Sequence, residues 1–152
     1  MLNQIGDPDP KTDKTGIAGL VTARTSFQPQ EAISMLRAFL RERPQDFQFV
    51  LRVIPIQKVV STDLYEIEQA ATQLAPQFQH DETFRITIEK RFTNMRTKDI
   101  IEAAARSIEN RVRLADPDKI LLIEVVGRLT GLSIVQSTDT MSTVKERSDA
   151  QR

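Results

Sequence analysis

In one short segment of the chain, a strand-like spacing of apolar residues is followed at once by a helix-like spacing. This change of spacing constrains the fold more than any other feature. Residues 84–91, FRITIEKR, alternate apolar with polar side chains, which is the period of a half-buried strand. Residues 97–112 then place apolar side chains every three or four positions, as an amphipathic helix does. We expect an antiparallel strand with one solvated side, a basic loop, and a helix that Thr97 caps.

Strand and helix patterns alternate along the rest of the chain as well. Asp63 followed by Glu66 matches a capping box at the start of one helix. The order strand-helix-strand-helix-strand-helix-strand-strand, with a hairpin at the end, predicts an α+β (mixed α/β) fold with helices layered on a mixed sheet. The further strands are expected over 16–25, 46–56, 119–126 and 132–135, and the further helices over 28–44 and 61–78.

Both ends of the chain are polar. Residues 1–15 are rich in Asp and Pro and are expected to form a disordered tail, and residues 138–152 a polar C-terminal tail. Nothing at the N-terminus resembles a signal peptide, and the longest apolar run, ILLIEVV, is too short to span a bilayer. The absence of cysteine excludes disulfides, thiolate zinc sites and cysteine nucleophiles. We expect a cytoplasmic protein without a membrane partner.

The side chains that carry most enzyme chemistry are scarce or isolated. The one histidine, His80, lies in a polar turn, where a surface residue is expected rather than a metal ligand. No P-loop, G-x-G-x-x-G or G-x-S-x-G motif is present. Glu124, inside the most apolar strand, is expected on an exposed edge of the sheet, with a paired buried carboxylate as the alternative. We therefore expect no catalytic residue, no metal ion and no cofactor, and we do not expect an enzyme.

Charge is divided unevenly along a chain whose formal net charge is zero. Residues 85–113 contain eight basic and four acidic side chains, a net charge of +4, whereas residues 31–82 contain five basic and eight acidic ones, a net charge of −3. A basic segment in a neutral chain is compatible with a localised anionic partner. The alternative, which charge alone favours, is an ordinary solvated surface.

Three motifs follow one another in residues 50–137. They are Arg-x-x-Pro at Arg52–Pro55; a Phe-led strand that ends in Lys90–Arg91, followed by a loop, a basic residue and the Ile100–Ile101 helix; and a Val-x-Leu-x-x-Pro turn at 112–117, before an apolar strand. In this order they resemble a THUMP domain, a tRNA-binding module of enzymes that thiolate, methylate, deaminate or acetylate tRNA. The sequence is most similar to the single-THUMP adaptor proteins that help an RNA cytidine acetyltransferase modify tRNA.

The resemblance implies an organisation and a function. It implies a THUMP domain over 47–137, preceded by an N-terminal ferredoxin-like portion over 16–46, and it implies binding of the tRNA acceptor stem and its single-stranded 3′ end. THUMP enzymes carry their catalytic domain on the same chain, and the sequence here leaves no room for one. We therefore expect a non-catalytic adaptor that presents tRNA to an RNA cytidine acetyltransferase for acetylcytidine formation.

Basic residues end the strand over 84–91 and begin the helix over 97–112. Cations spaced along an RNA backbone neutralise phosphates, and the free N–H groups of a helix start add a partial positive charge. A basic residue two helical turns into the helix extends this set, and Arg113 stands where the family usually has Asp. The candidate RNA contacts are Arg52, Lys90, Arg91, Arg96, Lys98, Arg106 and Arg113.

Aromatic residues are few, so base stacking is expected only if Phe92 or Phe27 is exposed. For Phe92, packing in the core is the favoured alternative. Two rival functions stay open at this point. One is a generic RNA-binding module in tRNA or ribosome maturation, and the other is a structural α+β interaction protein without an RNA partner.

Overall fold

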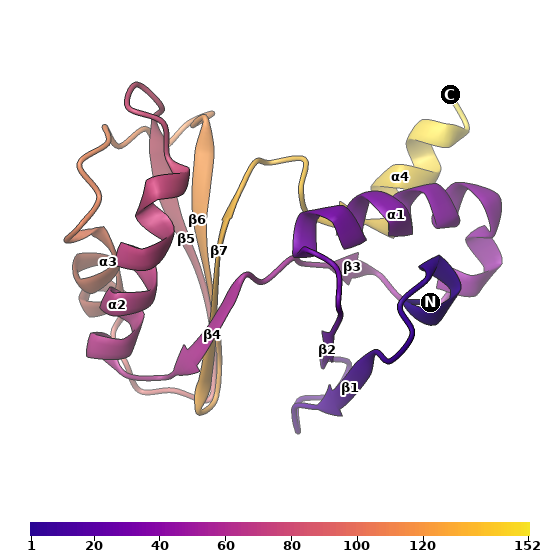
Figure 1. Cartoon of the computed structure of the whole chain (residues 1–152), viewed down its shortest axis with the longest axis horizontal. Coiled ribbons are helices and arrows are strands. Elements are labelled where there is room, and N and C mark those ends of the chain that lie inside the picture. Colours follow the sequence, from indigo (N-terminus) through magenta and orange to yellow (C-terminus); the bar gives the residue numbers. More distant parts are fainter. The chain divides into compact units, whose positions relative to one another are not determined.

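The structure is a computed structural model that describes residues 1–152. The chain forms two compact units (Figure 1). Residues 56–137 form the first, which we call the sheet unit; residues 1–55 and 138–152 together form the second, which we call the discontinuous unit. The first boundary follows residue 55, whereas the resemblance implies one after residue 46. No helix combines the length and the apolar character that a membrane span requires.

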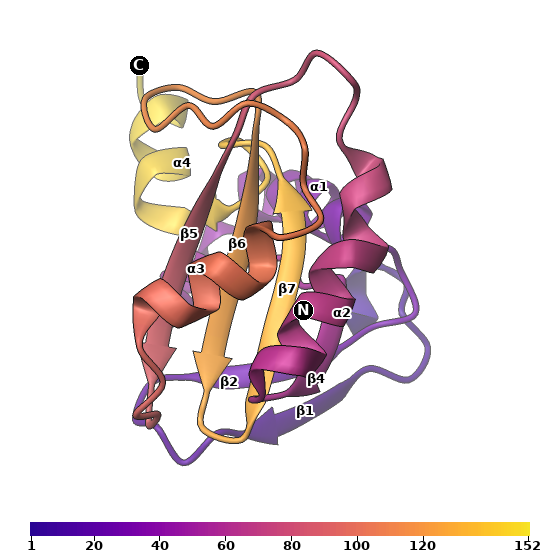
Figure 2. The ribbon, with the colours of Figure 1, turned by 90° about the vertical axis from the view of Figure 1, so that its left-hand side faces the viewer.

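The sheet unit is a mixed four-stranded sheet with two helices on one face (Figure 2). Its elements are β4 (Lys58–Ser61), α2 (Leu64–Leu74), the 3-10 helix η3 (Ala75–Gln77), β5 (Phe84–Arg91), α3 (Thr97–Ala105), β6 (Lys119–Val126) and β7 (Leu129–Val135). The strand order is β4-β7-β6-β5, with β7 antiparallel to both of its neighbours and β5 parallel to β6. The expected α+β fold, with helices layered on a mixed sheet, is confirmed.

The core of the sheet unit lies between the two helices and the sheet. The buried stripe that the sequence predicts on α2 packs with alternate residues of β6 and β7. Phe78 and Phe84 add an aromatic contact, with ring centroids 5.2 Å apart. Burial of one large apolar side chain contributes about 1.5–3 kcal/mol, so this cluster stabilises the unit substantially. Its completely buried aliphatic members are Ile67, Ile100, Ala104, Leu121, Ile123, Val125 and Leu132.

The direction in which β5 pairs differs from the expectation. The sequence predicts an antiparallel strand, but β5 runs parallel to β6 along its whole length, with Phe84 opposite Lys119 and Arg91 opposite Val126. The cause is the connection between the two strands. Helix α3 and the loop after it return the chain to the end of the sheet where β5 began, and such a crossover makes the strands parallel.

The two helices of the sheet unit begin differently. The carboxylate of Asp63 accepts a hydrogen bond from the Glu66 backbone N–H at 3.1 Å, so the predicted cap of α2 is confirmed. Thr97 does not cap α3, because it is already the first helical residue. Arg96 holds the cap position and makes no side-chain capping bond. The first-turn N–H groups of α3 therefore have no capping side chain as partner.

The long strand expected over 46–56 does not form. The structure has instead a 3-10 helix, η2 (Pro44–Phe47), and a two-residue strand, β3 (Arg52–Val53). Phe47 is buried, whereas Phe49 and Leu51 are exposed, so the alternating apolar residues do not share one buried side. The strand β4 was not predicted, because its four residues, KVVS, do not alternate apolar with polar side chains.

The discontinuous unit is built from both ends of the chain. Besides η2 and β3, its elements are η1 (Asn3–Ile5), β1 (Lys11–Lys14), β2 (Val21–Arg24), α1 (Pro29–Glu42), β8 (Met141–Ser142) and α4 (Thr143–Ala150). The strands form two antiparallel pairs, β1 with β2 and β3 with β8. The core residues are Ile33, Leu36, Leu40, Phe47 and Met141.

Neither end of the chain is the tail that its composition predicts. Near the N-terminus, Asp7 is buried, and the Thr25 hydroxyl donates to its carboxylate at 2.5 Å, which lowers the pKa of Asp7. Near the C-terminus, Met141 is buried and Glu146 of α4 lies 2.7 Å from Nε of Arg37 on α1. Both ends are ordered by partners far away in sequence, which local composition does not reveal.

Candidate nucleic-acid interface

One end of the sheet unit brings together the ends of two strands and the start of a helix (Figure 2). Strands β5 and β6 end there, the turn between β6 and β7 closes it, and α3 begins a few residues beyond β5. The Gly127 N–H donates to the Arg91 carbonyl oxygen at 2.8 Å, and the Thr62 N–H donates to the Arg128 carbonyl oxygen at 2.8 Å. We call residues 90–98 and 127–129 the carboxyl edge; these residues include five basic ones and no acidic one. Two carboxylates adjoin them, because Asp99 follows Lys98 along the chain and Asp63 follows Thr62.

Arg128 also belongs to this edge, and no local sequence pattern points to it. It follows Gly127 in the two-residue turn of the hairpin, where Gly127 has φ 60°, as the first central residue of a type II′ turn does. The Arg128 side chain is exposed and forms no ion pair. The hairpin was predictable from sequence. Its position beside the end of β5 was not, because that requires knowing that β5 neighbours β6.

Lys90 is likewise free of an acidic partner. Its Nζ donates to the carbonyl oxygen of Met95 at 2.9 Å, across the loop that leads to α3. Met95 packs against the core, and its N–H donates to the Thr93 hydroxyl at 3.2 Å. The loop is thus held at both ends, and Lys90 presents its charge at the surface.

Arg96 and Lys98 are exposed and form ion pairs within α3. The Arg96 guanidinium donates to both oxygens of Asp99, at 3.0 and 3.1 Å, and this carboxylate raises the pKa of Arg96. Lys98 lies 3.8 Å from Glu102. Exposed pairs of this kind contribute only about 0–1 kcal/mol. A phosphate can therefore replace either carboxylate at small cost.

Arg91 forms an ion pair inside the sheet unit. Its Nη1 lies 2.7 Å from Oε2 of Glu124, and the two side chains are 30% and 9% exposed. The expectation that Glu124 faces an exposed edge is wrong, because β6 lies between β5 and β7; the alternative, a paired buried carboxylate, is the one found. Since Arg91 neutralises this carboxylate, we place it outside the set of phosphate contacts.

Two of the three remaining candidates lie away from the carboxyl edge within the sheet unit, and the third belongs to the other unit. Arg106 lies just past the other end of α3 and pairs with Glu68 of α2 at 2.5 Å. The Arg113 N–H donates to the carbonyl oxygen of Phe84, the first residue of β5, seven residues or about 23 Å of strand away from Arg91. Arg52 belongs to β3 in the discontinuous unit.

Phe92 lies at the surface of the carboxyl edge, directly after β5. Its side chain is 76% exposed, so the expectation that it packs in the core is wrong. Its backbone has φ 56°, a left-handed conformation that bulky residues rarely adopt. Phe27, the other aromatic candidate, is half-buried in the discontinuous unit.

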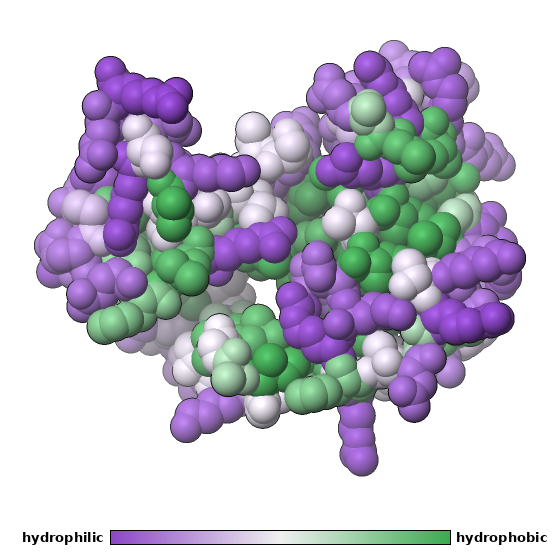
Figure 3. Space-filling view, turned by 180° about the vertical axis from the view of Figure 1, so that it is seen from behind, coloured by the Kyte–Doolittle hydropathy of each residue, from purple (hydrophilic) through white to green (hydrophobic).

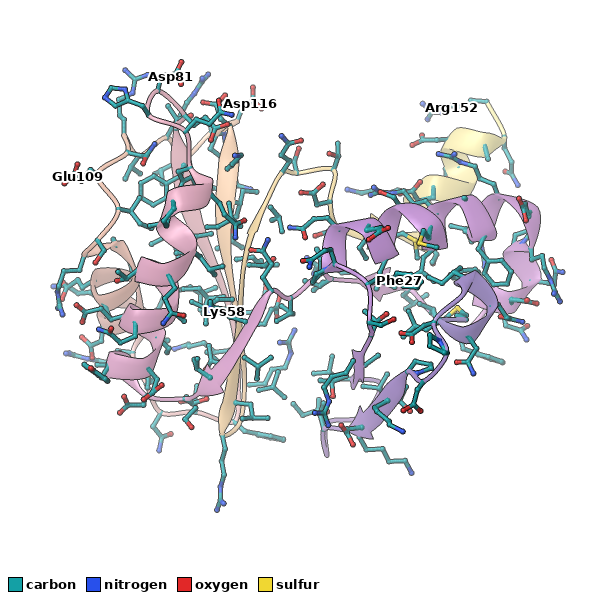
Figure 4. All side chains as sticks on the ribbon, viewed as in Figure 1. Phe27, Lys58, Asp81, Glu109, Asp116 and Arg152 are labelled. Carbon is teal, nitrogen blue, oxygen red and sulfur yellow. The ribbon has the colours of Figure 1, made fainter.

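The opposite end of the sheet, which we call the amino edge, comprises residues 79–83 and 110–119 and includes four acidic and three basic residues. Figure 4 shows Asp81 and Asp116 at this end. The Thr83 N–H and hydroxyl both donate to Oδ2 of Asp118, at 2.8 and 2.9 Å, and these bonds lower the pKa of Asp118. His80 is exposed here, and no group of side chains in the structure is arranged to hold a metal ion.

Comparisons with known proteins bear on this unit directly. The family model of the THUMP domain matches residues 61–135. Two solved structures are similar to the chain: PH1313 from Pyrococcus horikoshii Ot3, with a TM-score of 0.63, and TrmN from Thermus thermophilus, with a TM-score of 0.55. Both are 14% identical in sequence, over 92% and 84% of this chain, so they show the fold alone. This chain covers 43% and 38% of theirs. The search of curated proteins returned no match.

Proposed function

We propose that the protein binds tRNA at its acceptor stem and single-stranded 3′ end, because residues 61–135 match the family model of the THUMP domain, an RNA-binding module. The observation that carries the proposal is the carboxyl edge. There, Lys90 and Arg128 have no acidic partner, and two more cations have only weak exposed ones. Phosphate contacts supply a large share of the affinity of proteins for nucleic acids, and this edge contains groups that can make them.

The start of α3 strengthens this assignment. Its first-turn N–H groups have no capping side chain, and helix N-termini attract phosphate through such groups and through the helix dipole. Arg96 and Lys98 flank these N–H groups in sequence. A phosphate at this position would exchange the surface pairs with Asp99 and Glu102 for charge-assisted bonds to the ligand.

The protein acts, in this proposal, as a non-catalytic adaptor in the cytoplasm that presents tRNA to an RNA cytidine acetyltransferase. A module that contacts both tRNA and enzyme raises the effective concentration of substrate at the enzyme without performing chemistry. The enzyme-facing surface is the acidic side of α2. The acidic segment 31–82 is divided between the two units, and within α2 Glu66 is exposed while Glu68 already pairs with Arg106.

Binding to tRNA is the first test. Affinity for tRNA with an intact 3′ end should exceed that for tRNA trimmed of its 3′ single strand. The logarithm of the binding constant should fall with the logarithm of salt concentration with a slope of roughly −2 to −3, or about −0.7 for each of three or four phosphate contacts. No binding to either RNA would support a structural protein, and equal affinity for both would move the contact away from the 3′ end.

Acetylcytidine measured in tRNA from a strain that lacks the protein tests the adaptor role. Its loss, restored by the wild-type chain, is the expected result. Unchanged acetylcytidine together with intact tRNA binding would support a generic RNA-binding module. The enzyme contact is tested separately by pull-down of the acetyltransferase with Glu66→Lys and Glu68→Lys variants, and unchanged pull-down would remove α2 as the contact.

A further inference from the structure

Phe92 combines two unfavourable features that the rest of the fold does not require. Figure 3 shows apolar groups reaching the surface at several places, so exposure alone singles out no residue. Phe92, however, is both 76% exposed and left-handed, with φ 56°. Glycine, asparagine and aspartate adopt this conformation most readily. A phenylalanine at this position gives the fold nothing that a smaller residue would not.

The loop that carries Phe92 is anchored by other residues. Met95 supplies its apolar contact with the core, and the Lys90 ammonium and the Thr93 hydroxyl bind the backbone of Met95. The exposed ring is therefore presented from a fixed loop rather than from a free one. Strain at an exposed residue on a well-anchored loop is a feature of ligand-binding positions.

Two cations lie near Phe92 along the backbone. Lys90 precedes it by two residues, and the hydrogen bond between Gly127 and Arg91 brings the turn that carries Arg128 beside it. An exposed aromatic ring with cations nearby is the combination by which proteins hold single-stranded nucleic acid: the base stacks on the ring while phosphates contact the charges.

From this juxtaposition we infer that Phe92 is a stacking platform for one unpaired base of the RNA 3′ end. The inference rests on the proposed function and specifies the part of the site that touches a base. Lys90 and Arg128 hold the phosphates on either side of that base. Since every base offers a π-face, the platform favours single-stranded over paired RNA without selecting a base.

Phe92→Leu tests the inference, because it keeps an apolar side chain and removes the aromatic face. Affinity for tRNA with an intact 3′ end should fall about 5- to 150-fold, the range of one base–aromatic stack, with the salt slope unchanged. Affinity for trimmed tRNA should not change. The matched control is Phe49→Leu, a phenylalanine of the discontinuous unit that is 88% exposed and should leave binding unaltered.

A second variant reports the stack directly. The chain contains no tryptophan, so Phe92→Trp introduces a single fluorophore and preserves a stacking surface. Its emission should be quenched by tRNA with an intact 3′ end and not by trimmed tRNA, with affinity close to that of the wild type.

The possible outcomes distinguish a failure of the stacking inference from a failure of the proposed tRNA binding. If Phe92→Leu binds intact tRNA as tightly as the wild type, or weakens intact and trimmed tRNA equally, the stacking role is overturned while tRNA binding stands. If the variant binds tRNA normally but loses acetyltransferase pull-down, the ring is a protein contact instead. If the wild type binds neither RNA, the proposed function itself has failed.

Discussion

The amino edge contains seven charged side chains and the carboxyl edge five, and the two ends of the four-stranded sheet use them differently. At the amino edge, cations lie among four carboxylates. Lys119 is 3.0 Å from Glu82, and the charges of Arg113 and Arg111 help to lower the pKa of Asp118. The residues of the carboxyl edge include five basic ones and no acidic one; of the adjoining carboxylates, Asp63 caps α2 and Asp99 makes an exposed pair with Arg96, and only Arg91 is held by a buried partner. The difference separates charges that hold the fold together from charges that are available to a ligand.

The contrast shows why a count of basic residues along the sequence is a poor guide to an anion site. Residues 85–113 include cations from both edges, and their net charge of +4 describes neither. What distinguishes the carboxyl edge is the parallel pairing of β5 with β6, which brings the end of one strand, the turn after the other and the start of α3 together. The strand pairing assembles the site, and the run of basic residues in the sequence does not by itself locate it.

Charge reversal at the two edges should give the largest difference. Lys98→Glu with Arg128→Glu is expected to weaken tRNA binding roughly 10- to 100-fold and to make the salt slope shallower by about 1.4, since two phosphate contacts are lost. Arg111→Glu with Arg113→Glu should change the affinity less than about threefold. Filter binding or fluorescence anisotropy across a salt series measures both. Equal losses for the two pairs would erase the distinction between the edges.

Arg91→Ala should act on stability more than on binding. It leaves the Glu124 carboxylate buried without a partner, which costs about 3–5 kcal/mol for a fully buried pair and about 1–3 kcal/mol here, because Arg91 is partly exposed. Thermal unfolding should show a lower Tm, and adding Glu124→Ala should recover part of it. Arg96→Ala, at an exposed pair, should leave Tm nearly unchanged. A wild-type Tm for Arg91→Ala combined with lost tRNA binding would return Arg91 to the RNA-binding set.

The amino edge should reveal its structural role at acid pH. The hydrogen bonds that Thr83 donates to the Asp118 carboxylate lower the folded-state pKa of Asp118 below the ordinary value of 3.8. Their contribution to stability is therefore complete above that value and is lost as pH falls through the folded-state pKa. Melting curves between pH 5 and pH 2 should show a smaller loss of Tm for Asp118→Asn than for the wild type. Parallel curves would mean that this carboxylate does not serve the fold.

Phe92→Gly should give the smallest effect on stability and a change of unusual sign. Glycine adopts the left-handed conformation without a steric cost. The free energy of unfolding should therefore stay constant or rise by up to about 1 kcal/mol, and Tm should stay constant or rise with it. A marked decrease in Tm would show that the ring supports the fold after all.

Sequence patterns located the sheet unit well because its elements are long and amphipathic. The stripe of α2, the capping Asp63 and the central strand β6 follow from local spacing. The direction of β5 did not, since it depends on which strand becomes its neighbour. The place of Arg128 in the interface and the burial of Glu124 depend on the same pairing, and no local pattern contains it.

The discontinuous unit was predicted less well, for a related reason. Its first and last segments are polar and short, and each is ordered by partners more than fifteen residues away, as Asp7 is by Thr25 and Glu146 by Arg37. The helix α1 was an exception because it is long and has its own apolar stripe. Composition identifies segments that cannot fold alone; it does not identify the contacts that order them.

Crosslinking of tRNA to the protein, with the crosslinked residues mapped, tests the central claim most directly. A photoreactive nucleotide in the single-stranded 3′ end is expected to attach to residues 90–98 and 127–129 of the wild-type chain. Crosslinks confined to the amino edge or to the discontinuous unit, on an RNA that binds specifically, would contradict the account.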